Sequence, residues 1–267
     1  MEKEEDLKSL IKEKYGKIAI KASPIQSSSC CNCCSDNSID YSIMNEKYDH
    51  LEGYVPDADL GLGCGLPTEY SGIKDGDTVL DLGSGAGNDV FIARRIVGNS
   101  GEVIGIDMTK EMVERAISNS SKLGYSNVKF ILGEIENIPL KSDIIDVVIS
   151  NCVLNLVPNK LKAFSEIYRV LRSGGHFCIS DIVLTKDLPD SIKEATEMYT
   201  GCVAGALTLE EYLAIIKKAG FINIEIKKLK DITIPTIILK AYLTDDDFHQ
   251  FGIDLGIKSI TIVGYKN

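Results

Sequence analysis

A short glycine-rich segment constrains the fold of this chain more than any other feature. Asp81-Leu-Gly-Ser-Gly-Ala-Gly87 begins in the last residues of an apolar run, Thr78–Leu82, and leads into a helical pattern over Asn88–Ile96. Glycines at such a junction let the backbone turn tightly and approach a ligand closely. An apolar strand, a glycine-rich turn and a helix in this order predict the start of a βαβ unit.

Strand and helix patterns continue to alternate beyond this segment. The predicted strands of the core are Thr78–Leu82, Glu102–Ile106, Val128–Leu132, Ile144–Ser150 and Phe177–Val183. The predicted helices between them are Asn88–Ile96, Thr109–Leu123 and Lys160–Leu171, the last ending at Gly174-Gly175. This alternation predicts an α/β fold with a mostly parallel twisted sheet and helices on both faces.

The two ends of the chain show different patterns. Residues 3–19 form an amphipathic helical pattern with Leu7, Leu10, Ile11, Tyr15 and Ile18 on one face, and residues 41–59 favour short helices. Near the C-terminus we expect helices Ser191–Tyr199 and Thr208–Lys218 and strands Ile222–Lys227, Ile232–Leu239 and Ile260–Gly264. We therefore expect three parts: an N-terminal helix with a cysteine-rich loop (1–60), the core (61–185), and a small α+β portion that completes the sheet (186–267).

Composition excludes several classes of function. The net charge of -10 and the absence of a basic stripe argue against a nucleic-acid partner. No apolar run is long enough to span a bilayer, and the charged start MEKEEDLKSL is no secretory signal. We therefore expect a cytoplasmic chain with no membrane partner. In that reducing compartment, its eight cysteines are metal ligands, redox groups or small buried side chains rather than structural disulfides.

The glycine spacing and two acidic residues indicate the ligand of the core. Asp107 ends the second strand, 20 positions after Gly87, where a carboxylate can accept hydrogen bonds from both ribose hydroxyls. The G-x-G-x-G spacing departs from the G-x-G-x-x-G of most NAD sites, which argues against an NAD-dependent oxidoreductase. Asp81 would repel a pyrophosphate but suits a ligand with an ammonium group and a sulfonium. S-adenosylmethionine carries both.

The core resembles the class I methyltransferases, which have a Rossmann-like fold. Their first motif, D/E-x-G-x-G-x-G, matches residues 81–87, and the resemblance extends over about residues 61–185 through Gly133-Glu134, Asn151-Cys152-Val153 and Arg169-Val-Leu-Arg172. It implies S-adenosylmethionine as the cofactor. By the same resemblance, Asp81, Gly83, Ser84 and Gly85 hold the methionine part, Asp107 the ribose, Met108 and Gly133-Glu134 the adenine, and Asn151 one wall of the cofactor site.

Three cysteines stand in predicted loops with small neighbours, which leaves each sulfur open to a ligand. They are Cys64 between two glycines, Cys152 at the end of the fourth strand, and Cys202 after Gly201. Three thiolates suit a soft centre, whereas structural zinc sites usually have paired C-x-x-C knuckles. Trivalent arsenic takes three sulfurs and keeps a lone pair that can attack a sulfonium methyl without a general base. The alternative is that these cysteines are three unrelated buried side chains.

The sequence segments around these cysteines resemble those of the arsenite methyltransferases. The matching segments are Leu62-Gly-Cys64-Gly-Leu-Pro67, Gly105-Ile-Asp107-Met-Thr109, Ser150-Asn-Cys152-Val-Leu-Asn-Leu-Val-Pro158 and Gly201-Cys202-Val-Ala-Gly205. The resemblance implies that arsenic(III) binds Cys64, Cys152 and Cys202 and receives the methyl of S-adenosylmethionine. It also implies a cysteine disulfide that thioredoxin or glutathione reduces. We expect the chain to act as a monomer.

Other readings of the sequence stay open. The cluster Cys30, Cys31, Cys33 and Cys34 favours arsenic delivery or redox chemistry over a zinc site. A methyltransferase for a quinone or sterol would share the core but would need no cysteine triad. A non-catalytic thiol-based arsenic or metal sensor would not need the intact set Asp81, Gly83, Gly85 and Asp107.

Overall fold

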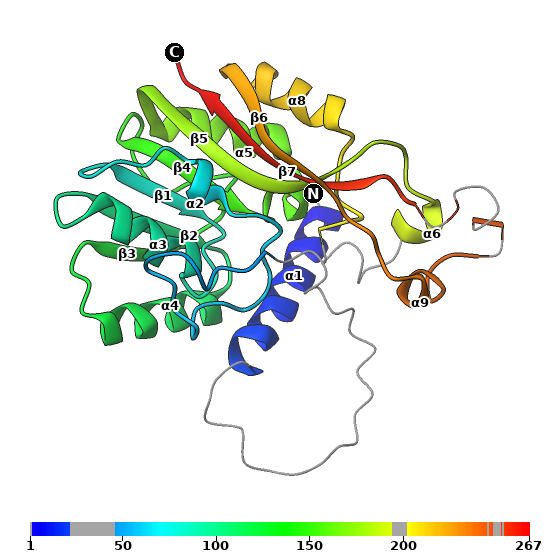
Figure 1. Cartoon of the computed structure of the whole chain (residues 1–267), viewed down its shortest axis with the longest axis horizontal. Helices are drawn as coiled ribbons and strands as arrows, with labels where there is room; N and C mark the ends of the chain where they lie inside the picture. Colours follow the sequence, from blue (N-terminus) through cyan, green and yellow to red (C-terminus); the bar gives the residue numbers. More distant parts are fainter. Residues whose placement is uncertain (1, 22–45, 194–201, 245, 248–251, 253) are drawn as a thin grey trace, which may run out of the picture.

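Seven strands form one mixed sheet in a computed structural model of the chain, which describes residues 2–21, 46–193, 202–244, 246–247, 252 and 254–267 (Figure 1). The strand order is β3-β2-β1-β4-β5-β7-β6. The first five strands are mutually parallel, and β7 runs antiparallel to both β5 and β6. The predicted α/β class and the Rossmann-like parallel core are therefore confirmed.

The strands are β1 Thr78–Leu82, β2 Glu102–Asp107, β3 Val128–Leu132, β4 Ile145–Asn151, β5 Leu171–Leu184, β6 Ile222–Asp231 and β7 Ile257–Tyr265. The helices are α1 Glu2–Lys21, α2 Pro67–Tyr70, α3 Asn88–Val97, α4 Lys110–Leu123, the 3-10 turn η3 Leu154–Leu156, α5 Lys160–Val170, α6 Asp190–Lys193, α8 Leu209–Lys218 and α9 Thr236–Leu239.

Alternate residues of the central strands enter two separate hydrophobic clusters. Val79 and Val147 pack in one cluster with Phe91 of α3, whereas Leu80 and Val148 pack in the other, which also contains residues of α5 and α8. Successive side chains of a strand point to opposite faces of the sheet. Both faces of the sheet are therefore covered by packed side chains.

Local signals placed most helix ends well. Gly124 follows α4 in the left-handed conformation, with φ of 68°, which a glycine adopts without steric cost. Thr208 caps α8 in a capping box with Glu211, at the start of the helix predicted over Thr208–Lys218. These ends fix the helices against the sheet and leave the loops at the carboxyl ends of the strands free to form a site.

Several sequence predictions were wrong. The fifth strand starts at Leu171, directly after α5, because Leu171 pairs with Ile145 before the ladder shifts register. The predicted strand over 232–239 contains helix α9 instead, because Pro235 has no N–H for a strand ladder and suits a helix start. Residues 46–59 form turns rather than short helices.

Two predictions near the termini have mixed outcomes. Leu10, expected on the buried face of α1, is 36% exposed, whereas Ile11 is buried. The helix predicted over 191–199 is present as α6 Asp190–Lys193, and residues 194–199 lie outside the described residues.

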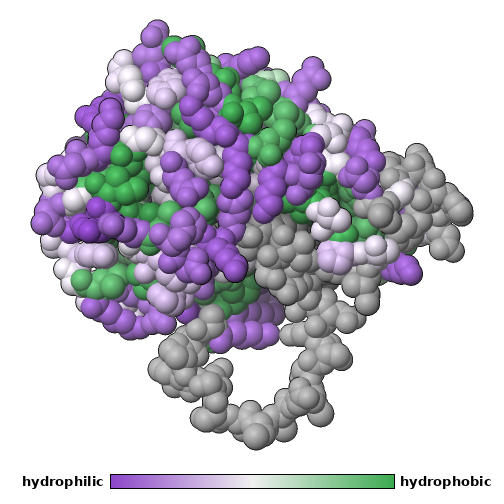
Figure 2. All heavy atoms as spheres, viewed as in Figure 1, coloured by the Kyte–Doolittle hydropathy of each residue, from purple (hydrophilic) through white to green (hydrophobic). Residues whose placement is uncertain are grey.

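Figure 2 shows that the described part of the face in view is largely hydrophilic, with hydrophobic side chains in scattered patches. Among the described helices, none combines the length and the apolar character needed to cross a bilayer.

Candidate active site

A pocket opens at the carboxyl ends of β1, β2, β3 and β4, where open α/β sheets bind their ligands. Every residue that the sequence predicted for the cofactor lines it: Asp81, Gly83, Ser84, Gly85, Asp107, Met108, Gly133, Glu134 and Asn151. The structure therefore brings this whole set together in one cavity, although their individual contacts with a ligand stay predictions.

The glycine loop after β1 forms the floor of the pocket. Gly83 has φ of 69°, and a Cβ there would lie 2.4 Å from Cγ2 of Val153, so only glycine fits. Gly85 has φ of 51°, and a Cβ built on it would meet no atom within 4 Å. The first glycine allows close packing against the loop after β4, and the second borders space that a ligand can fill.

Asp107 is held in place by backbone donors. Gly85 N donates to its Oδ2 at 2.9 Å, and Thr109 N donates to its Oδ1 at 2.8 Å. A carboxylate oxygen has two lone pairs, so both oxygens can still accept a hydrogen bond from a ligand hydroxyl. This arrangement fits a ribose with two adjacent hydroxyl groups.

Two buried acids of the pocket, Asp81 and Asp89, favour a cationic ligand beside them. Burial, together with the nearby charges of Asp89 and Asp107, raises the pKa of Asp81 well above its usual value. Burial likewise raises the pKa of Asp89 to about 6, and its Oδ1 is buried without a hydrogen-bond partner in the described structure. An ammonium or sulfonium ligand would relieve both effects, so these residues fit S-adenosylmethionine.

Sequence reasoning missed Asp89 and the side chain that orients it. The Tyr48 hydroxyl donates to Asp89 Oδ2 at 3.1 Å, and both residues line the pocket. The only sequence signal for Asp89 was its place in the first turn of the helix after the glycine loop. Tyr48 carried no signal, because it precedes the first strand by thirty residues and its segment has no regular pattern.

Helix α1 covers the expected adenine end of the pocket. Its Lys8 and Lys12 form ion pairs with Glu134 at 2.8 and 3.2 Å, and Ile11 and Tyr15 also line the pocket. The hydrogen bond from Lys8 is the main reason that the pKa of Glu134 lies below its usual value. Glu134 thus remains charged and anchored to α1, and its predicted bond to the adenine amino group is a separate, untested role.

Asn151 connects the cofactor pocket to the first cysteine. Cys64 N donates to Asn151 Oδ1 at 3.0 Å, and Asn151 Nδ2 donates to Gly65 O at 2.8 Å. A Cβ on Gly63 would lie 2.7 Å from Asn151 Nδ2, and one on Gly65 would lie 2.6 Å from Ser180 Oγ. The glycines on both sides of Cys64 therefore allow its loop to lie directly on the ends of β4 and β5.

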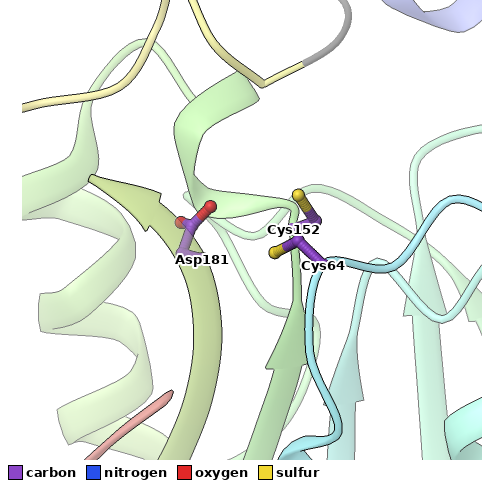
Figure 3. A group of neighbouring side chains, drawn as sticks. All are labelled: Cys64, Cys152 and Asp181. Carbon is purple, nitrogen blue, oxygen red and sulfur yellow. The ribbon is translucent and has the colours of Figure 1, made fainter. Parts of the chain in front are cut away.

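The three predicted cysteines pack together next to Asn151. One ligand atom each from Cys64, Cys152 and Asp181 lies within 4.8 Å of the others, and Figure 3 shows the Cys64 sulfur directed toward Asp181 on β5. The Cys202 thiol donates to Cys152 O at 2.8 Å, and the Cys152 thiol is hydrogen-bonded to both other cysteines. The fold thus gathers residues that are up to 138 positions apart in sequence.

The expectation of open, exposed sulfurs was wrong. Cys64, Cys152 and Cys202 are 0%, 7% and 3% exposed, and they pack in a hydrophobic cluster with Leu156 and Ile182. Cys152 also lines the cofactor pocket. A ligand on the three sulfurs would therefore sit in a dry interior next to the pocket rather than at the surface.

Backbone strain occurs at two of these cysteines. Cys152 has φ of 59° and Cys202 has φ of 65°, in the left-handed region that favours glycine. Such a conformation costs a residue with a Cβ about 1–2 kcal/mol. A purely structural role would be served better by glycine, so the strain indicates that the thiols themselves are used.

Burial and mutual hydrogen bonds keep the thiols protonated. Burial is the main cause that raises the pKa of Cys64 above its usual value. The hydrogen bond to Cys152, followed by burial, raises the pKa of Cys202 well above its usual value. Metal or metalloid binding would therefore have to release these protons, as it does at other thiolate sites.

Asp181 is the second functional candidate that the sequence did not reveal. Its carboxyl is fully buried, accepts a hydrogen bond from the Tyr212 hydroxyl at 3.1 Å, and has its pKa raised by burial to about 7. The Lys160 ammonium, also largely buried, partly offsets that shift. In sequence, Asp181 was merely one polar residue inside an apolar strand.

The remaining cysteines have other surroundings. Cys178 is buried in another hydrophobic cluster, with Val147 and Val263. The cluster of Cys30, Cys31, Cys33 and Cys34 lies outside the described residues, so its predicted role in arsenic delivery or redox chemistry stays a prediction.

Comparisons with known proteins agree with this geometry. A family model described as a methyltransferase domain matches residues 73–220. Arsenite methyltransferase of Halobacterium salinarum is 42% identical over 83% of this chain and 59% of that protein. Arsenite methyltransferase of Aquipseudomonas alcaligenes is 31% identical over 88% of this chain and 68% of that protein.

The chain belongs to the arsenite methyltransferase family. The crystal structure of an arsenic (III) S-adenosylmethionine methyltransferase from Chlamydomonas reinhardtii matches with a TM-score of 0.66 and 37% identity, covering 76% of this chain and 67% of that chain. S-adenosylmethionine is the methyl donor of this family, and the strand-end pocket holds the residues expected to bind it. The chain spans about three fifths to two thirds of the length of the curated arsenite methyltransferases.

Proposed function

We propose that this chain methylates trivalent arsenic. The observation that carries the proposal is the meeting of Cys64, Cys152 and Cys202 in a buried cluster that borders the cofactor pocket through Cys152. Arsenite, then methylarsenite, binds these sulfurs as substrate, and its lone pair accepts the methyl group. When bound, S-adenosylmethionine supplies that group as an electrophilic sulfonium methyl.

The chain contributes mainly by positioning two bound reactants. Asp107 would hold the ribose, and Asp81 and Asp89 would hold the charged methionine end, so that the methyl faces Cys152. The hydrophobic surroundings of the thiols exclude water, which strengthens the attraction between a polarised donor and an electron-rich acceptor. No general base is needed, because the attacking atom carries a lone pair and loses no proton.

Exchange of arsenic onto the cysteines has a simple proton balance. Each thiol that forms an As–S bond loses its proton, and that proton leaves with the thiol or water displaced from arsenic. The raised pKa values of Cys64 and Cys202 make displacement of a thiol carrier, which takes up the proton, more favourable than binding of free thiolates. A glutathione complex of arsenite is therefore the proposed form of the substrate.

The methylated product needs a reductant before another cycle. Transfer oxidises arsenic formally by two electrons, and two cysteine thiolates can return them by forming one disulfide. Two thiols of thioredoxin or glutathione then reduce that disulfide. We place this chemistry in the cytoplasm, in a monomeric protein. The described cysteines are free thiols, which suits a reducing compartment.

The direct test is methylation by the purified chain. We expect arsenite, S-adenosylmethionine and excess glutathione to give methylated arsenic, measured by chromatography with mass detection of arsenic. Cys178→Ser, a buried change outside the cluster, should methylate as well as the unaltered chain. A chain that binds S-adenosylmethionine but yields no methylated arsenic with any thiol would refute the proposal.

A further inference from the structure

The thiol cluster contains a fourth potential ligand, which trivalent arsenic does not require. The Asp181 carboxylate lies with Cys64 and Cys152 in a group whose ligand atoms are all within 4.8 Å of one another. Arsenic on three sulfurs is pyramidal, and its lone pair occupies the fourth direction. An oxygen ligand on the same cluster instead completes the tetrahedron that a divalent cation such as zinc prefers.

We propose that the arsenic site also binds a thiophilic divalent cation, of the zinc and cadmium class, through Cys64, Cys152 and Asp181. The Cys202 thiol lies next to this group, where it donates to Cys152 O at 2.8 Å, and its sulfur would have to turn away from that carbonyl to serve as a fourth ligand. A site of thiolates with one carboxylate is chemically suited to zinc and cadmium, whereas calcium and magnesium prefer oxygen ligands alone.

Distances and burial support this assignment. Zinc–sulfur bonds of about 2.3 Å and zinc–oxygen bonds of about 2.0–2.2 Å place neighbouring ligand atoms roughly 3.5–3.8 Å apart. In the observed group all three ligand atoms lie within 4.8 Å of one another, so a bound cation would draw them closer together. All of its residues are buried, so a bound cation would be shielded from water and reached through the pocket that Cys152 lines.

The surrounding network prepares the carboxylate for such a role. Asp181 accepts hydrogen bonds from Tyr212 Oη at 3.1 Å and from Ile182 N at 2.9 Å, which fix its orientation toward the sulfurs. Bonds of this kind orient ligands at metal sites. Binding releases one proton from each thiol that ligates, and from the carboxyl when it is protonated, without any change in oxidation state.

The cation and arsenic would then exclude one another. Both need the sulfurs of Cys64 and Cys152, so a cell rich in zinc or exposed to cadmium would hold the protein in a form that cannot accept arsenite. This consequence for activity rests on the proposed function, whereas the metal site itself stands on the geometry of Cys64, Cys152 and Asp181.

The test uses the full chain with Cys30, Cys31, Cys33 and Cys34 replaced by serine, so that other thiols near the N-terminus do not bind the probe. We expect one equivalent of cadmium chloride to bind, with the ultraviolet absorption of thiolate–cadmium bonds. Asp181→Asn should weaken cadmium binding at least about tenfold. The same variant should still bind one equivalent of phenylarsine oxide, which needs sulfur alone and reports an intact thiol cluster. The matched control Cys178→Ser should change neither titration.

A second measurement leaves Asp181 unaltered. X-ray absorption of the zinc-loaded serine variant should show mixed sulfur and oxygen ligation, and Asp181→Asn should change the oxygen contribution. Equal cadmium affinity with and without Asp181, or zinc bound by sulfur alone, overturns the proposal. Arsenite methylation by the unaltered chain separates the two claims: methylation without cadmium binding removes only the metal site, and cadmium binding without methylation removes only the proposed function.

Discussion

The cofactor pocket and the thiol cluster are neighbours that form in different ways. The pocket is built largely from residues at the carboxyl ends of parallel strands, such as Asp107 at the end of β2 and Gly133 directly after β3. The cluster joins Cys64, Cys152 and Cys202 from three loops, two of them in strained backbone. The strand ends thus assemble most of the first region, whereas the second exists only when the loops that carry the three cysteines pack together.

Electrostatics also separates the two regions. Buried carboxyls make the pocket favourable for a cationic ligand, whereas protonated thiols make the cluster uncharged and soft. Each region should therefore bind its own ligand when the other is damaged. The following experiments test that independence.

Loss of the Cys152 sulfur should have the largest effect on arsenite methylation. Cys152→Ser removes the thiol that both borders the pocket and contacts the other two cysteines, so methylation of arsenite should fall below detection. S-adenosylmethionine affinity, measured by calorimetry, should stay within about twofold, since no hydrogen bond to the cofactor is predicted for this sulfur. Unimpaired turnover would show that the cluster is not the acceptor site.

Damage to the pocket should give the reverse pattern. Asp107→Ala removes a charged acceptor, so S-adenosylmethionine affinity should fall by about ten- to hundredfold, as expected for hydrogen bonds to charged groups. Binding of phenylarsine oxide to the cysteines should be unchanged. If phenylarsine oxide binding weakens in parallel, the pocket and the thiol cluster do not bind their ligands independently.

A smaller effect should appear on varying pH. The pKa of Asp89 in the free chain is raised to about 6, so its carboxyl is protonated below that pH and charged above it. A cationic ligand stabilises the charged form, so S-adenosylmethionine affinity should rise with pH through about 6, by up to about tenfold. In the free chain the raised pKa of Asp89 favours the folded state while the carboxyl is protonated, so this stability is fully present at low pH and is lost as pH rises through about 6.

Asp89→Asn should flatten this dependence of affinity on pH, because the amide does not titrate. Calorimetric titrations between pH 5 and pH 8 provide the measurement. A dependence of the same shape in Asp89→Asn would assign the effect to another group, such as Asp81.

The smallest effect should come from helix α1. Lys8→Ala removes a partly exposed ion pair with Glu134 and a second ion pair with the buried Glu136. Neither carboxylate is lost, and partly exposed pairs contribute little, so S-adenosylmethionine affinity should change by less than about fivefold. A larger loss would mean that α1 is part of the binding site itself rather than a cover over its adenine end.

The sequence predicted the residues of the pocket, but it predicted neither the burial of the three cysteines nor the position of Asp181 beside them. Strand ends and glycine spacing are local signals, and they located Asp81, Gly85 and Asp107 without any knowledge of packing. The cysteines were found through their neighbouring residues, but their burial was not, since burial depends on loops that meet only in the folded chain. Asp181 was missed for the same reason: nothing local shows that β5 places its carboxyl beside Cys64.

The boundaries that failed have physical explanations too. The start of β5 was placed too late because Gly174-Gly175 indicates a loop, whereas Leu171 already pairs with Ile145 before the register shift. Helix α9 was taken for a strand because its apolar run has no helical period and only Pro235 argued otherwise.

The central claim is that three sulfurs from distant loops bind one arsenic atom. Arsenic X-ray absorption on the chain with the four N-terminal cysteines changed to serine, loaded with one equivalent of arsenite and no added thiol, tests it directly. The account predicts three sulfur neighbours for arsenic, and fewer in Cys202→Ser but not in Cys178→Ser. Arsenic that keeps its oxygen neighbours, or that has the same ligands in Cys202→Ser, would contradict it.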